Sequence, residues 1–437
     1  MILRRVVDVR PEEVRATLMA CAYFFFALCS WFILRPIRDE MGVAGGVSNL
    51  PWLYTGTMAA TLVANPLYSS LVVRFPVKRF IAIAYRVIMA LVIGFFLLFQ
   101  VWPQYDLWIG RAFFVTSSVF NLFITAIFWS FMADRFRSDQ GKRLFAFIGV
   151  GGTVGAIVGS AVTAALAERV GRLALLLVAV ALLEVAVQCV RHFPATFRES
   201  EDPAREQRAE EERPIGGSAW ANVTHVLRSP YLIGICGFML LFTIGSTSLY
   251  FHQADLAGKA FQDRAARTAF LARMDLAVQS LTVFLQVFVT GRLLRAIGVA
   301  PTLAILPAVS VAGFAALGAV PVLPVLVVFF VLRRALNFGL TNPTREVLFT
   351  VLPREDKYKA KSFIDTFVYR GGDQIGAWSY ALLLGLGFSQ SVIAWTVVPL
   401  SAAWLALALW LGRRQAALAG REPQAGSLPG APLPARV

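Results

Sequence analysis

Long apolar stretches separated by short polar loops run along the whole chain, and charged residues collect in the loops. Each stretch is close to the roughly 20 residues that an α-helix needs to cross a bilayer. The pattern therefore predicts an all-α membrane protein with little room for a soluble domain. We expect about twelve transmembrane helices, at residues 13–34, 50–72, 79–100, 107–132, 144–166, 172–190, 229–251, 270–290, 297–317, 320–341, 362–386 and 390–412.

A polar segment near the middle of the chain divides these helices into two sets of six. Residues 191–228 mix Arg and Glu without apolar periodicity, which is typical of a solvated linker. We expect an N-terminal six-helix half at 1–190, a charged cytoplasmic linker at 191–228 and a C-terminal six-helix half at 229–412. A tail rich in Pro, Gly and Ala at 413–437 is expected to be cytoplasmic and disordered.

A weak internal repeat suggests that the two halves are related. In each half a basic loop leads to a Phe-Ile pair and then to paired glycines. The matching positions are Phe147, Ile148, Gly151, Gly152, Gly155 and Ala156 in the first half, and Phe363, Ile364, Gly371, Gly372, Gly376 and Ala377 in the second. With the helix count and the linker, the repeat points to a major-facilitator-like arrangement, in which two halves rock about a site at the membrane midplane.

Composition and charge agree with this interpretation. Hydrophobic residues make up 57% of the 437 positions and charged residues 15%, compared with about 25% charged in soluble domains. The net charge of +15 would suit a nucleic-acid partner, but the basic residues lie mainly in alternate loops, as cytoplasmic loops require. We therefore expect a multi-pass protein of the bacterial inner membrane with both termini cytoplasmic, and no nucleic-acid partner. The loop with Lys259, Arg264 and Arg267 is the one poor fit.

Residues for hydrolytic or metal chemistry are not grouped in the sequence. The three histidines and four cysteines are scattered without metal-ligand spacing, and no nucleophile motif surrounds a serine. We expect no enzyme activity, no metal and no cofactor. The expected surroundings are the lipid bilayer, and the expected state is a monomer.

Charged side chains inside the apolar stretches are the strongest functional candidates, because charge at lipid depth is costly and normally faces a cavity or a partner. The first helix ends with Arg35, Arg38 and Asp39, and Arg35 is one helical turn from Asp39. An ordinary charged helix end on the outer side of the membrane would explain the same residues. Asp275 and Glu184 are two further candidates for buried carboxylates.

Polar residues form stripes on two further helices at helical spacing, and in the tenth expected helix they fall within roughly 60° at 100° per residue. The stripes are Arg334, Asn337, Thr341 and Arg345 in the tenth expected helix, and Ser117, Ser118, Asn121 and Thr125 in the fourth. We expect the stripes to face a cavity, although hydrogen bonding between helices would also produce them.

The eleventh expected helix carries Asp365, Tyr369, Arg370 and Asp373. At 1.5 Å per residue, Arg370 lies about 13 Å along the helix from Lys361, which is intramembrane depth. A structural ion pair with Asp373 is the alternative to a role in binding.

Three short motifs resemble a known family. They are Leu34, Arg35, Pro36, Ile37, Arg38 and Asp39 against Leu-Arg-x-x-Lys-Asp; Phe128, Trp129, Ser130 and Phe131 against Phe-Trp-Gly-Phe; and Lys361, Ile364, Asp365, Arg370, Gly371 and Gly372 against Lys-x-x-Ile-Asp and a basic residue before Gly-Gly. With these motifs the chain resembles the ATP:ADP antiporter (nucleotide transporter) family of plastids and intracellular bacteria, and looks most similar to its divergent members in free-living bacteria.

The resemblance implies a secondary transporter whose first candidate substrates are ATP and ADP. Two departures bear on the substrate. The fourth helix of the family carries a glutamate implicated in nucleotide transport where this chain has Ser117, and Arg38 replaces a lysine. Arginine keeps the charge and adds planar, two-point contacts with phosphate. We therefore widen the expected substrate from ATP and ADP to an anionic, phosphorylated solute.

These observations define a candidate site. We expect the solute to bind at Arg35, Arg38, Ser117, Asn121, Arg334, Asn337, Arg345, Tyr369 and Arg370, and coupling or gating to use Asp39, Glu346, Asp365 and Asp373. The arginines are expected to converge on one aqueous chamber without pairing with nearby acids, which would make the empty carrier slow to reorient and so favour exchange. A carrier of anionic lipid headgroups and a non-transporting membrane scaffold are the alternatives.

Overall fold

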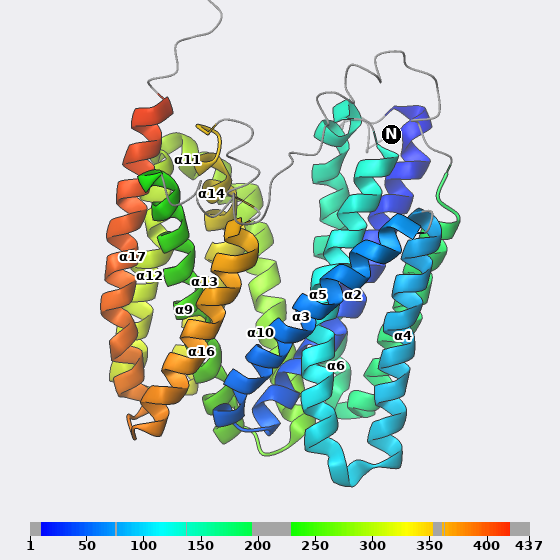
Figure 1. Cartoon of the computed structure of the whole chain (residues 1–437), viewed down its shortest axis with the longest axis horizontal. Coiled ribbons are helices and arrows are strands. Elements are labelled where there is room, and N and C mark those ends of the chain that lie inside the picture. The colour runs from blue at the N-terminus through cyan, green and yellow to red at the C-terminus, as the bar shows by residue number, and fades with distance from the viewer. Residues whose placement is uncertain are drawn as a thin grey trace, which may run out of the picture.

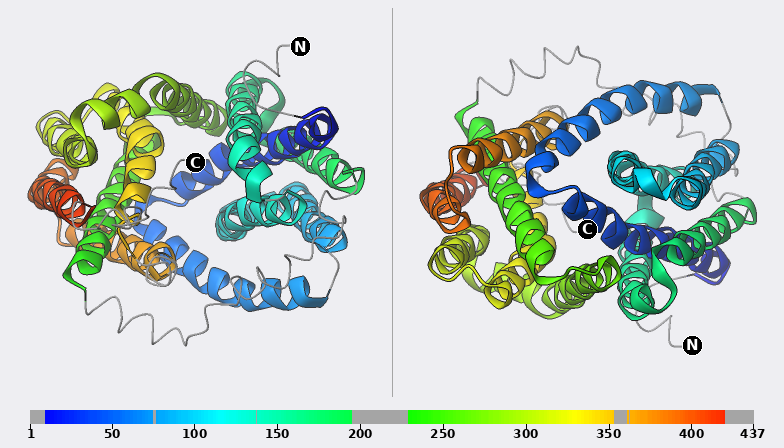
Figure 2. Two further views of the ribbon diagram at one scale, coloured as in Figure 1. Left: turned by 90° about the horizontal axis from the view of Figure 1, so that it is seen from above. Right: turned by 90° about the horizontal axis from the view of Figure 1, so that it is seen from below.

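The computed structural model describes residues 10–74, 77–136, 138–194, 229–352, 361 and 363–419. Throughout these residues the chain forms helices and short connections, with no strand. Figure 1 shows the helices gathered into two bundles that lie side by side, and the views from the two ends in Figure 2 separate the same two groups. The structure confirms the predicted all-α class.

The first bundle begins with a 3₁₀ turn, η1 (Pro11–Glu13). Its helices are α2 (Val14–Ala44), α3 (Leu50–Arg74), α4 (Val77–Val101), α5 (Asp106–Arg135) and α6 (Ser138–Arg191). Two of the predicted helices meet inside α6 without a loop between them. Gly171 bends the chain there with a φ of 73°, a conformation that is strained for residues with a side chain.

The second bundle contains three π-helical stretches that join or precede α-helices. Its helices are α9 (Pro230–Ala260), α10 (Arg264–Phe284), α11 (Gly291–Ile297), α12 (Val299–Ala319), α13 (Leu323–Leu336), α14 (Asn342–Leu348), α16 (Tyr369–Gly385) and α17 (Gln390–Ala419). The π stretches are η4 (Leu285–Thr290), between α10 and α11, η5 (Asn337–Thr341), between α13 and α14, and η6 (Ile364–Val368), before α16. Such stretches are rare in helices and occur often at functional sites.

Among the described residues, nine helices are long and apolar enough to cross a membrane. Dividing α6 at Gly171 and adding α3 and the helix at Ile364–Gly385 gives the twelve predicted segments, so the structure is compatible with that count. Residues 195–228, which hold most of the expected linker, lie outside the described part of the chain.

Several predicted helices end too early, including those predicted at 229–251 and 320–341, which continue to Ala260 and Leu348. Helix α2 was expected to end at residue 34 but continues to Ala44, because the charges after residue 34 pair with side chains from other helices and lie inside the protein. Helix α17 continues to Ala419, so residues 413–419 of the expected disordered tail are helical. The alanines and leucine of this segment are good helix formers.

One glycine in each half of the internal repeat, Gly155 or Gly376, packs on the main chain of a neighbouring helix. The paired glycines differ, since Gly151 approaches the Cys21 backbone and Gly371 meets nothing within 4 Å. On α6, a Cβ placed on Gly155 would lie 2.3 Å from the carbonyl oxygen of Phe25 on α2. On α16, Gly376 approaches the main chain of Ile244 on α9 in the same way. Helices α2 and α9 each open their own bundle, so the sequence repeat reflects equivalent packing of small residues on a neighbouring backbone.

The backbone contact of Gly155 can be tested by adding one methyl group. We expect Gly155→Ala to destabilise the protein by about 1–3 kcal/mol, because the backbones of α2 and α6 must separate. Gly94→Ala is the matched control, since a Cβ at Gly94 meets nothing within 4 Å. The measurement is the melting temperature in detergent. Equal melting temperatures for the two variants would contradict this account of the packing.

Candidate functional site

Five charged side chains from both bundles meet near the middle of the protein and form what we call the central cluster: Arg35, Arg38 and Asp39 on α2, Asp275 on α10 and Arg334 on α13. One oxygen of Asp275 lies 3.2 Å from Arg35 Nη1 and 3.6 Å from Arg334 Nη1 and so forms an ion pair with each. On the α2 side, Arg38 Nη2 lies 2.5 Å from an Asp39 oxygen, and Arg35 Nε lies 3.8 Å from the other. The cluster joins the two bundles.

The side chains of the central cluster are largely shielded from water, so their charges interact strongly. The side chain of Asp275 is 5% exposed and that of Arg35 9%, whereas Arg38 and Arg334 keep 15% and 23% of their surface. Three guanidinium groups face two carboxylates, which leaves one positive charge in excess. Buried charges are stable only when they are paired and hydrogen-bonded, so the cluster favours an additional anion.

Aromatic rings surround the exposed part of the cluster. The Arg38 guanidinium lies 5.2 Å from the Phe114 ring centre and 5.6 Å from that of Trp31. From the other bundle, the Tyr250 hydroxyl on α9 donates to Asp39 at 3.2 Å. The cluster thus combines guanidinium groups with aromatic rings that lie against them.

Arg370 and Asp373 form a second group on α16. Arg370 Nη1 lies 3.8 Å from an Asp373 oxygen, and Thr247 of α9 donates to Asp373 at 3.3 Å. The Tyr369 side chain is half-buried beside them and lies within electrostatic range of Arg334 and Arg345. Tyr369 therefore connects this pair to the central cluster.

Arg345 belongs to a third group and not to the central cluster. It lies 3.9 Å from Glu346, whose other oxygen accepts Lys361 at 2.7 Å. The predicted stripe assumed 100° per residue throughout, but the π stretch η5 inserts one extra residue between Arg334 and Arg345. That insertion turns the helix beyond it by about 100°, so the α-helical spacing used to predict the stripe does not hold across η5.

The expectation of unpaired arginines is also wrong. Each of Arg38, Arg334, Arg345 and Arg370 has a carboxylate oxygen within 4 Å. Local acids therefore balance much of the positive charge in this structure.

Several other predicted residues also differ from expectation. Ser117 is fully buried, and its hydroxyl donates to Phe113 of its own helix at 2.6 Å. The neighbouring Ser118 reaches the cluster instead, accepting Arg38 Nη1 at 3.5 Å. Glu184 is not buried, since its side chain is 38% exposed and pairs with Arg86.

Of the remaining members of the predicted site, Asn121 and Asn337 form no hydrogen bond or ion pair with the central cluster in the described part of the chain. Asn121 is exposed and Asn337 half-buried. The side chain of Asp365 lies outside the described residues.

A second set of charges joins the bundles at the end opposite the described chain ends, at the bottom of Figure 1. We call Glu40, Asp106, Arg172, Arg264 and Arg267 the distal network. Glu40 of α2 is completely buried and binds Arg264 of α10 through both oxygens, at 2.7 and 2.9 Å. Arg267 lies 3.4 Å from the same carboxylate, and Asp106 accepts both Arg172 and Arg264.

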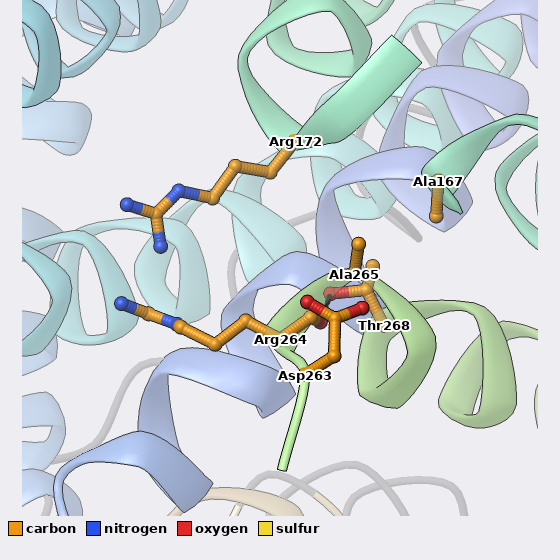
Figure 3. Close-up of a pocket in the computed structure, with 6 residues that line it drawn as sticks. All are labelled: Ala167, Arg172, Asp263, Arg264, Ala265 and Thr268. Carbon is orange, nitrogen blue, oxygen red and sulfur yellow. Dashed lines mark hydrogen bonds between the residues drawn. The ribbon is translucent and has the colours of Figure 1, made fainter. Parts of the chain in front are cut away.

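The distal network explains the loop that fitted the charge rule poorly. Arg264 and Arg267 are neutralised by Glu40 and Asp106, and Lys259 by Asp255 at 2.6 Å. Their charges are therefore balanced within the fold. A cavity of about 250 Å³ lies beside the network, and Arg172 and Arg264 extend along its rim in the same direction (Figure 3).

The sequence missed most of this arrangement. Asp275 was noted only as a buried acid, and neither Tyr250 nor the distal network was singled out. A search for acids that balance the expected outer-side arginines would have suggested Glu40 and Asp106, since both fall near predicted outer helix ends.

Comparison with known proteins assigns the fold to a family. The profile of the Major Facilitator Superfamily matches residues 16–372. The chain belongs to this superfamily. As a member it is a multi-pass membrane protein of the secondary-transporter type, and the similar proteins found are transporters and not enzymes.

Two relatives confirm the resemblance to ATP:ADP antiporters. ADP,ATP carrier protein 1 of Chlamydia muridarum is 23% identical over 306 residues. The aligned region covers 62% of the present chain and 58% of the carrier. ADP,ATP carrier protein 1 of Chlamydia trachomatis serovar D is 22% identical over the same shares. The chain thus spans 58% of the length of these relatives.

Solved structures show the superfamily fold at low sequence identity. The nucleoside transporter NupG superposes with a TM-score of 0.59 at 15% identity, covering 93% of this chain and 99% of its own. A D-xylose-proton symporter gives 0.63 at 13% identity, covering 90% and 96%. A bacterial homologue of the human lysosomal transporter Spinster, inward-facing and unoccupied, gives 0.58 at 12% identity, covering 94% and 95%.

The distal network makes a prediction about closure at its end of the protein. Glu40→Gln leaves Arg264 and Arg267 without their buried carboxylate, a loss of about 3–5 kcal/mol, and we expect the bundles to separate there more often. Gln253 is 4% exposed and lies beside Asp39 and Tyr250. A cysteine at this position, in a chain whose four native cysteines are replaced, should react with a maleimide at least about tenfold faster in the Glu40→Gln background.

Glu168→Gln is the control for this experiment. Glu168 pairs with Arg273 at 3.4 Å across the same end, but both side chains are at least half exposed. Exposed pairs contribute at most about 1 kcal/mol, so labelling should rise less than about fivefold. Similar rates in the two backgrounds would show that the buried network does not hold this end closed.

Proposed function

We propose that this protein carries an anionic, phosphorylated solute across the bacterial cytoplasmic membrane by alternating access, with nucleotides as the first candidates and exchange as the mode. The central cluster is the observation that carries the proposal. Arginines from both bundles meet there around too few carboxylates to balance them. Arginine binds phosphate through two parallel hydrogen bonds, which suits this excess.

The aspartates of the cluster act as internal counter-ions in this proposal. In the empty protein, Asp275 holds Arg35 of one bundle and Arg334 of the other. A phosphate entering the cluster offers more oxygens than one carboxylate and competes for both guanidinium groups. Binding thereby breaks a contact between the bundles and makes a new one through the solute, which couples occupancy to their relative movement.

The likeness to ADP,ATP carriers supports exchange as the mode. The sequence suggested a different reason, that an empty carrier with unpaired arginines would reorient slowly. That reason required unpaired arginines in the empty site, whereas the arginines have carboxylate partners. In the proposed mode, a solute molecule on the far side binds the same groups of the central cluster. It thereby lowers the barrier for the carrier to return to its first orientation. Asp39, Glu346, Asp365 and Asp373 remain the candidates for coupling, and Asn121, Asn337 and Tyr369 for positioning.

The proposed arrangement in the membrane follows the charge of the loops. The expected halves at 1–190 and 229–412 are the moving units, the linker at 191–228 and both termini are cytoplasmic, and the chain acts as a monomer. The distal network then lies on the outer side, and the Glu346 group lies toward the cytoplasm.

The test is transport by purified protein in proteoliposomes. We expect uptake of labelled ATP or ADP to saturate and to depend on nucleotide trapped inside. Arg38→Gln should raise the KM about 10- to 100-fold, because a charge-assisted hydrogen bond contributes about 1.5–3 kcal/mol. Arg295→Gln is the control, since that arginine is exposed and bonds only a carbonyl of its own helix among the described residues.

Two results would contradict the proposal. One is the absence of saturable exchange across nucleotides, sugar phosphates and inorganic phosphate by wild-type protein that is folded and correctly inserted. The other is an equal KM for Arg38→Gln and Arg295→Gln, which would remove the central cluster from the binding site.

A further inference from the structure

Arg333 is a buried charge that the proposed site does not use. It precedes Arg334 on α13 but points into the second bundle, where its side chain lies among α9, α12 and α17 and the residue is 3% exposed. Its guanidinium donates to the Ser310 hydroxyl at 3.0 Å, the Ser246 hydroxyl at 2.9 Å and the Phe242 carbonyl at 3.2 Å.

The partners of Arg333 are all neutral. Within the described part of the chain no carboxylate forms an ion pair with it. Both serines pass their own hydroxyl hydrogens to helix carbonyls, Ser246 to Phe242 and Ser310 to Leu306. Their remaining lone pairs are therefore fixed as acceptors for the guanidinium, which solvates the charge without cancelling it.

The surrounding helices are shaped to keep this charge in place. A Cβ on Gly245 of α9 would lie 3.0 Å from Arg333 Nη2, so glycine leaves room for the guanidinium. Aromatic rings of Phe242 and Trp404 lie 5.4 and 5.9 Å from its central carbon. A buried charge with neutral partners is unfavourable for folding, and arginine is among the residues least expected in such a place.

Arg333 also lies close to the candidate site. The adjacent Arg334 is a member of the central cluster, and Thr247, adjacent to Ser246, bonds Asp373. The Phe242 ring packs between Arg333 and Tyr369, 6.5 Å from the Tyr369 ring. The charge is thus separated from the site by one layer of side chains of low polarity, which screens it weakly.

We propose that Arg333 is a specificity-determining residue, a fixed positive charge that selects solutes of higher negative charge without touching them. This inference rests on the proposed function and deepens it. The central cluster and Arg333 together carry two positive charges in excess, which a solute with at least two negative charges neutralises. A unit charge about 12 Å away at an effective dielectric constant of about 20 changes the affinity about tenfold for one additional negative charge on the solute.

The test cancels the charge while keeping the arginine. Ser310→Asp places a carboxylate against Arg333 Nε, and Ser310→Asn adds nearly the same volume without charge. In exchange assays with labelled ATP and AMP, we expect the KM for ATP to be about tenfold higher in Ser310→Asp than in Ser310→Asn, with a smaller difference for AMP. A purely structural role would change protein yield or kcat and leave the ratio of the two KM values unchanged.

Further variants and outcomes keep the test decisive. Ser246→Asp against Ser246→Asn repeats the comparison from another helix, and Arg333→Gln against Arg333→Lys replaces it if neither aspartate folds. Equal KM ratios within these pairs overturn the inference while the proposed function stands. Wild-type protein without saturable exchange of either nucleotide overturns the inference, and the absence of exchange of sugar phosphates and inorganic phosphate as well overturns the proposed function too. Both results are seen before any variant is made.

Discussion

The structure depends on one constraint: a charge placed at membrane depth must find its counter-charge inside the protein. Water and lipid headgroups solvate the loops, but the middle of a bilayer offers neither. The chain meets this constraint by pairing charges between its two bundles. Asp275 forms ion pairs with arginines from α2 and α13, and Glu40 of α2 is enclosed by Arg264 and Arg267 of α10. The interface between the bundles is therefore held partly by charges that neither bundle satisfies alone.

The two charged groups carry the same excess, three guanidinium groups against two carboxylates in each. They differ in the contacts that surround the charges. In the distal network, the completely buried Glu40 is bonded by two arginines, and separating the bundles would leave it without them. In the central cluster, aromatic rings lie against Arg38, and the Tyr250 hydroxyl of the other bundle donates to Asp39. Charges are thus paired between the bundles at one end and in the central cluster alike.

The hydrophobic pattern was enough to predict the fold class, because helix length and apolar run length are set by the same membrane thickness. It also singled out Arg35, Arg38 and Arg334, each of which interrupts an apolar stretch and which the structure brings together in the central cluster. The pattern failed where a property depended on another helix or on local geometry. Helix α2 runs on past its charges, of which Arg35 and Glu40 have partners in the other bundle. The α-helical spacing used for Arg345 does not hold across η5, because a π stretch adds a residue that no periodicity rule anticipates.

Unbalanced buried charge lowers the stability of the fold. Whether a protein keeps such charge therefore helps to distinguish a carrier from a scaffold. A protein that needed only rigidity would gain stability if its buried ion pairs were replaced by apolar side chains. Here the second bundle instead retains Arg333 with serine partners and a glycine that makes room for it, beside a cluster that already has one positive charge in excess. Such an arrangement reduces stability in the empty protein, and in the proposed function a bound anion offsets this cost. Under that proposal the excess charge belongs to binding, because a buried charge with neutral partners lowers the stability of the fold.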